Sequence, residues 1–262
     1  MIYLLYLLLG AFAGVLSGLF GIGGGLVIVP VLLTTFKVLN FPAELSIHMA
    51  LGTSLATIIF TSMNSVWAHH KHKGVPWSVV RTMVPAVVIG SYLGGFVAHS
   101  LDATLLSYLF SGFIFLVALK MWFGVKVSSQ QPLPGTLGLS FAGSGIGFIS
   151  AIFGIGGGVI SVPLLSRFGL PMRNAVGASA ALGMPIAFTG ALSYVISGWD
   201  VADLPEMSLG YVYLPAFLGI VLASSLFSRV GANLSQKLEH RKLQRCFAIL
   251  LIVVCLKTLL TA

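Results

Sequence analysis

The chain has 262 residues, of which 57% are hydrophobic and 8% are charged. Because a soluble domain carries about 25% charged residues, this composition excludes a soluble fold and predicts an all-α polytopic membrane protein. The net charge of +8 is interpreted as loop charge at the membrane surface, so we expect no nucleic-acid partner.

Apolar segments follow one another along the chain, at approximately residues 2–36, 43–68, 77–99, 103–124, 134–166, 174–198, 209–229 and 243–261. Six of these eight fit a single transmembrane helix of about 20 residues, whereas the first and the fifth exceed 30 residues and are interrupted by glycines. The polar stretch Lys126–Pro134 is interpreted as a linker between two halves. We therefore divide one membrane domain into a first repeat, residues 1–127, and a second repeat, residues 128–262.

The glycine-rich interruption of the first segment recurs in the fifth. Phe-Gly-Ile-Gly-Gly-Gly begins at Phe20 and again at Phe153, and eight of the eleven positions from Phe20 to Pro30 are identical to those from Phe153 to Pro163. Each glycine costs about 1 kcal/mol against alanine in a helix, so both helices should break here. A broken backbone is tolerated in a bilayer only where protein or a water-filled cavity surrounds it. Two breaks at matching places point to the binding site of a transporter.

The positions of the basic residues indicate how the segments cross the membrane. If every segment crossed once, the 14 Lys and Arg residues would divide 6 to 8 between the two sides, without bias. If the two glycine-broken segments turn at the break and return, the division becomes 12 to 2, which follows the positive-inside rule. We therefore predict two inverted repeats, each with a glycine-broken re-entrant hairpin plus three transmembrane helices. Both termini should face outward and the linker the cytoplasm.

The glycine breaks are the main candidate substrate site. The helix that resumes after each break presents unpaired backbone N–H groups and the positive end of its dipole, and glycines let an anion approach these donors closely. Two such half-helices meeting head-on would bind a small anion near the midplane, whereas the alternative role of the glycines is close helix packing. The candidate residues in the breaks are Gly21, Gly23, Gly24, Gly25, Gly154, Gly156, Gly157 and Gly158.

A polar stripe on the second segment is the other candidate. Thr53, Thr57, Thr61 and Asn64 have helical spacing on one face, and Ser54 lies beside them. Such a stripe should line a substrate path, unless the hydroxyls only bond to carbonyls of their own helix. The candidate binding residues from this stripe are Thr53, Ser54, Thr57 and Asn64, together with Ser179 at the matching position of the second half.

Other polar residues and glycines favour structural roles. The four-residue spacing of Gly10 with Gly14, and of Gly90 with Gly94, predicts close helix contacts. The six carboxylates fall in loops or at segment ends, so none marks a proton relay or a cation site. The histidines between His69 and His72 are interpreted as a solvated basic face rather than a metal site, and His48 beside Glu44 as a weaker candidate for sensing pH.

At this point the residues match a known family. The twice-repeated glycine break with its following proline resembles the TauE/SafE family of bacterial sulfite exporters, as do Ala50–Ser54 with their counterpart Ala175–Ser179 and the basic stretch His69–Trp77. The resemblance covers nearly the whole chain. It implies a multi-pass inner-membrane protein that moves sulfite, sulfoacetate or related organosulfonates, usually outward. The second repeat departs from the family by carrying Ala178 where threonine is common.

The function we expect is export of small sulfur-containing anions by a secondary transporter. An importer or a channel-like pathway for another small anion remains the alternative, as does a membrane subunit driven by a partner ATPase. An intramembrane enzyme is disfavoured because the chain contains neither H-E-x-x-H nor G-x-S-x-G. We expect no metal and no cofactor, with a small anionic substrate and the lipid bilayer as partners, and a homodimer is left open.

Overall fold

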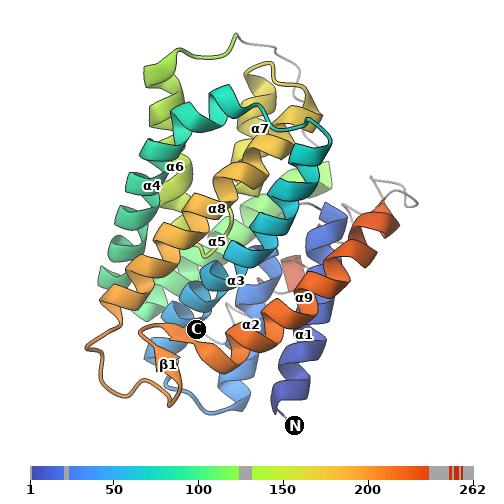
Figure 1. Ribbon diagram of the computed structural model, residues 1–262. Coiled ribbons are helices and arrows are strands. Elements are labelled where there is room, and N and C mark those ends of the chain that lie inside the picture. The colour runs from blue at the N-terminus through green and yellow to red at the C-terminus, as the bar shows by residue number, and fades with distance from the viewer. Residues whose placement is uncertain are drawn as a thin grey trace.

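The computed structural model describes residues 2–20, 24–123, 132–235, 248–249, 251–253 and 255. Helices dominate this part of the chain, as the sequence predicted (Figure 1). Their bounds are α1 Ile2–Phe20, α2 Gly25–Val38, α3 Ala43–Lys71, α4 Trp77–Ser100, α5 Ala103–Phe123, α6 Thr136–Ile152, α7 Gly158–Arg167, α8 Met172–Ser197 and α9 Leu214–Ser235. One antiparallel hairpin joins β1, Ser208–Leu209, to β2, Val212–Tyr213.

Among the described residues, four helices, α3, α4, α5 and α8, are long and apolar enough to cross a membrane by length and composition. The shortest of them, α5, has 21 residues, which at about 1.5 Å per residue match a hydrocarbon layer of about 30 Å. Their bounds lie within three residues of the predicted segments. The prediction of a multi-pass all-α membrane fold is therefore confirmed.

Both glycine-rich stretches interrupt a helix where the sequence predicted. The chain leaves α1 at Phe20 and resumes a helix at Gly25, and it leaves α6 at Ile152 and resumes at Gly158. Figure 1 shows that α1 runs away from the end of the molecule that carries the N-terminus and that α2 returns to it, while α6 and α7 do the same from the opposite end. The two breaks are confirmed, and the interpretation as inverted repeats stays a prediction.

Glycines bring two pairs of helices into backbone contact. A methyl group at Gly10 or Gly14 of α1 would lie 2.8 or 2.7 Å from the Cα atoms of Ile220 and Ser224 in α9. On α4, methyl groups at Gly90 and Gly94 would meet the backbone of α6. The predicted close helix contacts at these four glycines are confirmed.

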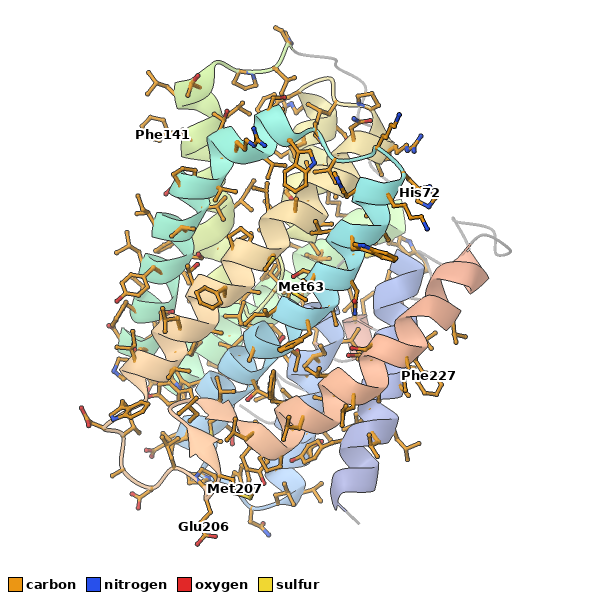
Figure 2. The ribbon with its side chains drawn as sticks, viewed as in Figure 1. Met63, His72, Phe141, Glu206, Met207 and Phe227 are labelled. Carbon is orange, nitrogen blue, oxygen red and sulfur yellow. The ribbon has the colours of Figure 1, made fainter. Side chains whose placement is uncertain are left out.

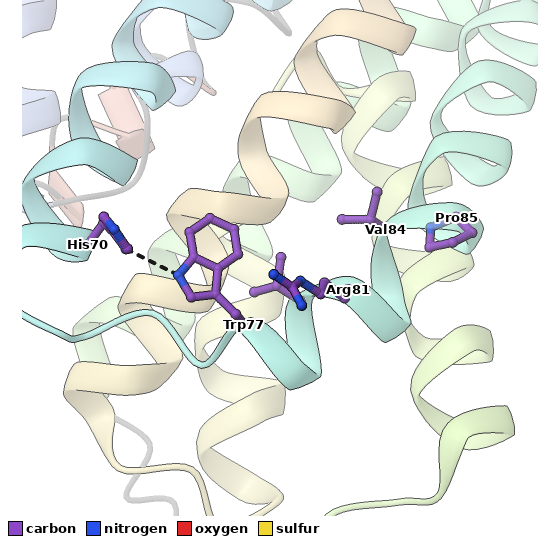
Figure 3. A pocket seen from close by; sticks show the side chains of 6 residues that line it. His70, Trp77, Arg81, Val84 and Pro85 are labelled. Carbon is purple, nitrogen blue, oxygen red and sulfur yellow. Dashed lines mark hydrogen bonds between the residues drawn. The ribbon is translucent and has the colours of Figure 1, made fainter.

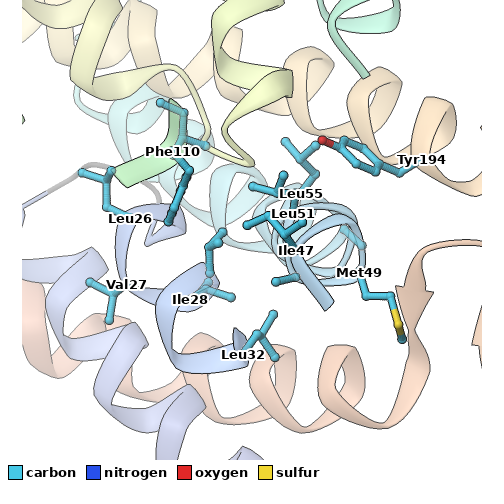
Figure 4. Close-up of a cluster of buried hydrophobic side chains, with 14 of the residues drawn as sticks. Leu26, Val27, Ile28, Leu32, Ile47, Met49, Leu51, Leu55, Phe110 and Tyr194 are labelled. Carbon is cyan, nitrogen blue, oxygen red and sulfur yellow. The ribbon is translucent and has the colours of Figure 1, made fainter. Parts of the chain in front are cut away.

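The core lies around α3, whose residues from Ser46 to Ile58 are all buried. α3 packs beside α8 along the middle of the bundle, and α2 packs on its other side. Figure 4 shows Leu26 of α2 beside Phe110 of α5, and Ile28 of α2 on the side toward Leu51 and Leu55 of α3. The helix that carries the predicted polar stripe is therefore the central one.

The start of the seventh segment differs from the prediction of a continuous apolar helix from residue 209. The structure places the β1–β2 hairpin at 208–213, and α9 begins at Leu214. Gly210 has a φ of 52° and lies against the backbone of Val195 in α8, which holds the chain in a turn. Pro215 at the second helical position then favours the start of α9. The eighth segment falls mostly outside the described residues.

Charges separate between the two ends of the bundle. Figure 2 shows His72 at one end and Glu206 at the other. At the His72 end, a side-chain nitrogen of Arg173 donates to the carbonyl oxygen of His72, which ties the α7–α8 connection to the α3–α4 connection. The described carboxylates lie at the other end, in or beside the connections of α2–α3, α4–α5 and α8–β1.

Candidate substrate-binding site

The two helices that follow the glycine breaks begin in the same way. Gly24 and Gly157 both have a φ of 76°, with ψ values of −16° and −13°, and each precedes the first residue of its helix. The carbonyl oxygen of Gly24 accepts bonds from the N–H groups of Val27 and Ile28, and that of Gly157 from Ile160 and Ser161. Because the first N–H groups of a helix have no partner within it, each break presents backbone donors at the end where the dipole is positive.

The start of α2 lies directly against the second break. A methyl group on Gly25 would be 2.7 Å from the carbonyl oxygen of Gly154 and 3.0 Å from the Cα atom of Ile155. Ile58 of α3 faces both breaks, because methyl groups on Gly25 and Gly156 would each lie 3.0 Å from its side chain. The structure thus brings Gly25, Gly154 and Gly156 together beside the central helix. Gly21 and Gly23 lie outside the described residues.

Ser54 links the central helix to the second break. Its hydroxyl donates to the carbonyl oxygen of Gly154 at 2.8 Å, in a fully buried position. Thr57 donates to the carbonyl oxygen of Ser54 at 2.7 Å, so its hydroxyl bonds to a carbonyl of its own helix, as the alternative interpretation of the stripe expected. Ser54 therefore joins the polar stripe to the second half at the break itself.

The side chains of two other members of the polar stripe face elsewhere. Thr53 Oγ1 accepts a bond from the backbone N–H of Tyr213 at 2.9 Å, so it anchors the β1–β2 hairpin. Asn64 is exposed and lies six residues beyond Ile58, about 9 Å further along α3.

Three serines lie at the start of α7, beside the second break. Ser161 Oγ lies 2.8 Å from Ser179 Oγ and 2.9 Å from the carbonyl oxygen of Gly157. Ser150 Oγ is 3.3 Å from the position of a methyl group on Gly157, and it is buried with no hydrogen-bond partner among the described residues. Ser179 was predicted, whereas Ser150 and Ser161 were missed.

A signal for one of the missed serines is present in the sequence. Ser150 corresponds to Ser17 when the two repeats are aligned on their glycine breaks, so a comparison extended upstream would have found a serine in both halves. Ser161 corresponds to Ile28, so the repeat gives no signal for it. Its role follows only from the packing of α7 against α8.

The surroundings of the breaks carry dipoles rather than charges. The buried polar side chains among the described residues are serines, threonines and His48, with no buried Asp, Glu, Lys or Arg. The described residues also contain no cluster of three or more His, Cys, Asp or Glu side chains with metal-binding geometry. An anion at the breaks would be stabilised by backbone N–H groups, hydroxyls and two helix dipoles, each equivalent to about half a positive charge.

His48 lies at the other end of the central helix, in the end of the bundle that carries Glu206. Its Nε2 is 3.1 Å from the carbonyl oxygen of Ala98, and its ring stacks on Tyr211 with centroids 5.2 Å apart. Tyr211 Oη is 3.0 Å from Nδ1 of His99, and burial raises the pKa of the tyrosine hydroxyl. His48 therefore belongs to an aromatic cluster that packs the β1–β2 hairpin against α3 and α4.

Comparisons with known proteins agree with this architecture. The model of the sulfite exporter TauE/SafE family matches residues 6–258. A probable membrane transporter protein of Haemophilus influenzae is 40% identical over 262 residues, covering 98% of both chains. Another, from Methanocaldococcus jannaschii, is 29% identical over 98% of this chain and 95% of its own. No solved structure gives a significant match.

The family match spans nearly the whole chain, and the relatives align along nearly their full length. The membrane-length helices and the paired glycine breaks suit the same assignment. The chain therefore belongs to the sulfite exporter TauE/SafE family and is a multi-pass membrane transporter.

Proposed function

We propose that the protein exports small sulfur-containing anions, such as sulfite, sulfoacetate or related organosulfonates, across a bacterial inner membrane as a secondary transporter. The family name supports this substrate class. Efflux of an anion from a negative-inside cell is favoured by about 2.3 kcal/mol per charge per 100 mV. Such an exporter needs no coupling ion, which is compatible with the uncharged surroundings of the breaks among the described residues.

The observation that carries the proposal is the unpartnered hydroxyl of Ser150 beside the start of α7. A buried donor without a partner costs about 1–3 kcal/mol, and the Ser150 hydroxyl lies where a ligand at the break could supply that partner. An oxyanion at the break would accept the Ser150 hydroxyl together with N–H groups from the first turn of α7. The bond would complete the hydrogen bonding of Ser150 only when substrate is present.

The Ser150→Ala variant tests this role. Loss of a hydrogen bond to a charged group costs about 1.5–3 kcal/mol, so we expect the affinity for the transported anion to fall roughly tenfold to a hundredfold. The stability of the unliganded protein should stay the same or rise, because an unpartnered buried hydroxyl is removed. Calorimetric titration of the purified protein with sulfite, sulfoacetate, taurine and chloride measures the affinity, and thermal unfolding measures the stability.

Ser111→Ala is the matched control. The hydroxyl of Ser111 is also buried without a hydrogen-bond partner among the described residues, but it lies on α5, where its carbonyl oxygen contacts Cys255. This variant should bind anions like the wild type. Normal affinity in the Ser150→Ala variant would remove Ser150 from the site. Tighter binding of chloride than of the sulfur-containing anions would replace the proposed substrate with another small anion.

A further inference from the structure

A groove of about 520 Å³ lies at the His72 end of the bundle, well away from the glycine breaks. It is formed where α3 ends and α4 begins, as Figure 3 shows. Its lining residues are His70, Trp77, Val80, Arg81, Val84 and Pro85. The proposed transport function uses none of these side chains.

The polar side of the groove is built from three side chains. Trp77 Nε1–H donates to His70 Nδ1 at 3.2 Å, and the two rings meet edge to face with centroids 5.7 Å apart. Because Nδ1 accepts this bond, neutral His70 carries its proton on Nε2, which is left as a donor. Figure 3 shows the guanidinium of Arg81 beside the indole of Trp77.

Arg81 has no carboxylate partner within the described part of the chain. The described carboxylates, Glu44, Asp102, Asp200, Asp203 and Glu206, lie at the opposite end of the bundle. A guanidinium offers up to five N–H donors in a planar fork that fits a phosphate in a bidentate manner. The groove therefore contains an arginine whose guanidinium N–H groups are available to bind an anion.

The depth of Arg81 corresponds to the level of lipid headgroups. α4 has 24 residues and is about 36 Å long, whereas the hydrocarbon layer is about 30 Å thick. Arg81 is the fifth residue of α4, about 6 Å from its start, so it lies near the edge of the hydrocarbon layer. Trp77, one turn nearer the surface, is a side chain enriched at this level of a membrane.

An apolar track continues from Arg81 toward the middle of the membrane. Pro85, Ile89 and Leu93 follow at four-residue intervals on the same face of α4, and Ile89 and Leu93 are 59% and 51% exposed. A cationic head above an exposed apolar track matches a phosphate that carries acyl chains. A small water-borne anion would make no use of the track.

We propose that this groove binds an anionic phospholipid, with the phosphate on Arg81 and the Nε2–H of His70 and an acyl chain along Pro85, Ile89 and Leu93. Trp77 holds His70 in the required tautomer and forms the wall against which the headgroup lies. The site is separate from the proposed anion path and does not depend on what the protein transports.

Lipid retention by the purified, delipidated protein tests the proposal. Native mass spectrometry should show that wild type retains phosphatidylglycerol, and that Arg81→Gln retains it about tenfold less because it loses a bidentate charge-assisted contact. Arg167→Gln is the matched control, since Arg167 is an exposed cation at the same end of the bundle and outside the groove. It loses the same charge and should retain the lipid like wild type.

Equal retention by Arg81→Gln and Arg167→Gln would overturn the site. If Arg81→Gln does not fold, Arg81→Lys keeps the charge without the fork, and the proposal requires intermediate retention; unchanged retention would contradict it. Thermal unfolding separates the two sources of phosphate. Phosphatidylglycerol should raise the melting temperature of wild type, and an equal rise with inorganic phosphate alone would mean that the groove takes a free oxyanion rather than a lipid.

Discussion

At the scale of single residues, the glycines of the breaks serve different physical needs. Gly24 and Gly157 adopt the left-handed conformation, with φ of 76° at both, which disfavours any residue with a Cβ atom. Gly25 is required instead by the close approach of the carbonyl oxygen of Gly154. Gly156 is less constrained, because its φ is not in the left-handed region and its missing Cβ would meet one side-chain carbon of Ile58, at 3.0 Å, and no backbone atom. Gly156 is therefore the glycine whose substitution reports on the ligand rather than on folding.

Alanine at Gly157 should mainly lower stability, whereas alanine at Gly156 should mainly lower affinity for the anion. Gly157→Ala should lose about 1–2 kcal/mol from backbone strain, so its melting temperature should fall, and the end of the Ile186 side chain, 2.7 Å from the added methyl group, must shift. Gly156→Ala should lose less stability than Gly157→Ala, since only the Ile58 side chain must give way, while binding the anion more weakly because a methyl group narrows the approach to the backbone donors. Thermal unfolding and calorimetric titration of both variants measure these effects. Wild-type stability of Gly157→Ala would contradict the assignment of strain.

At the scale of the elements, glycines rather than large apolar residues hold the outer helix pairs together. Apolar side chains gain little by leaving lipid for protein, so membrane helices associate through close packing, which small residues permit. Gly90 and Gly94 on α4 face α6, and Gly143 on α6 faces the carbonyl oxygen of Met83 in α4, where a methyl group would lie 3.0 Å away. The two helices therefore fit through glycines on both sides of the contact.

Gly90→Ala should destabilise the α4–α6 pair. A methyl group there meets the carbonyl oxygen of Ser144, and overpacking of this kind costs about 1–3 kcal/mol. Gly112→Ala on α5 is the control, because nothing lies within 4 Å of its missing Cβ, and the better helix propensity of alanine should leave stability equal or slightly higher. Melting temperatures of the two purified variants provide the comparison, and an unchanged value for Gly90→Ala would show that the helices separate without cost.

The elements that the sequence predicts well are those encoded by local composition. Long apolar runs predicted α3, α4 and α5 within a few residues, and clustered glycines predicted where α1 and α6 end, because both effects act along the chain. The β1–β2 hairpin was missed because two-residue strands have no periodicity, and its turn at Gly210 depends on contact with Val195. The contact of Ser161 with Ser179 was missed for the same reason, since it exists only after α7 packs on α8.

At the scale of the whole molecule, the two hairpins approach each other from opposite ends. Figure 1 shows α6 beginning and α7 ending at the end opposite the N-terminus, whereas α2 ends near the N-terminus. Apart from Lys37, the described Arg and Lys residues lie toward the end of the bundle opposite the N-terminus. Each is in a connection there or in the part of a helix nearest to that end. By the positive-inside rule we predict that this end faces the cytoplasm. The two half-helices α2 and α7 would then start near the midplane and point to opposite faces of the membrane.

Accessibility of single cysteines in intact cells tests this arrangement most directly. In a background that lacks Cys246 and Cys255, cysteines at Thr136 and Arg167, which flank the second hairpin, should both be protected from an impermeant thiol reagent and react only after the membrane is opened. Cysteines at Lys37 and Asp203 should react from outside, and His72→Cys is the control for the cytoplasmic face. Labelling of positions 136 and 167 from opposite faces would mean that α6 and α7 together cross the membrane, and it would contradict the re-entrant hairpin on which the proposed anion site depends.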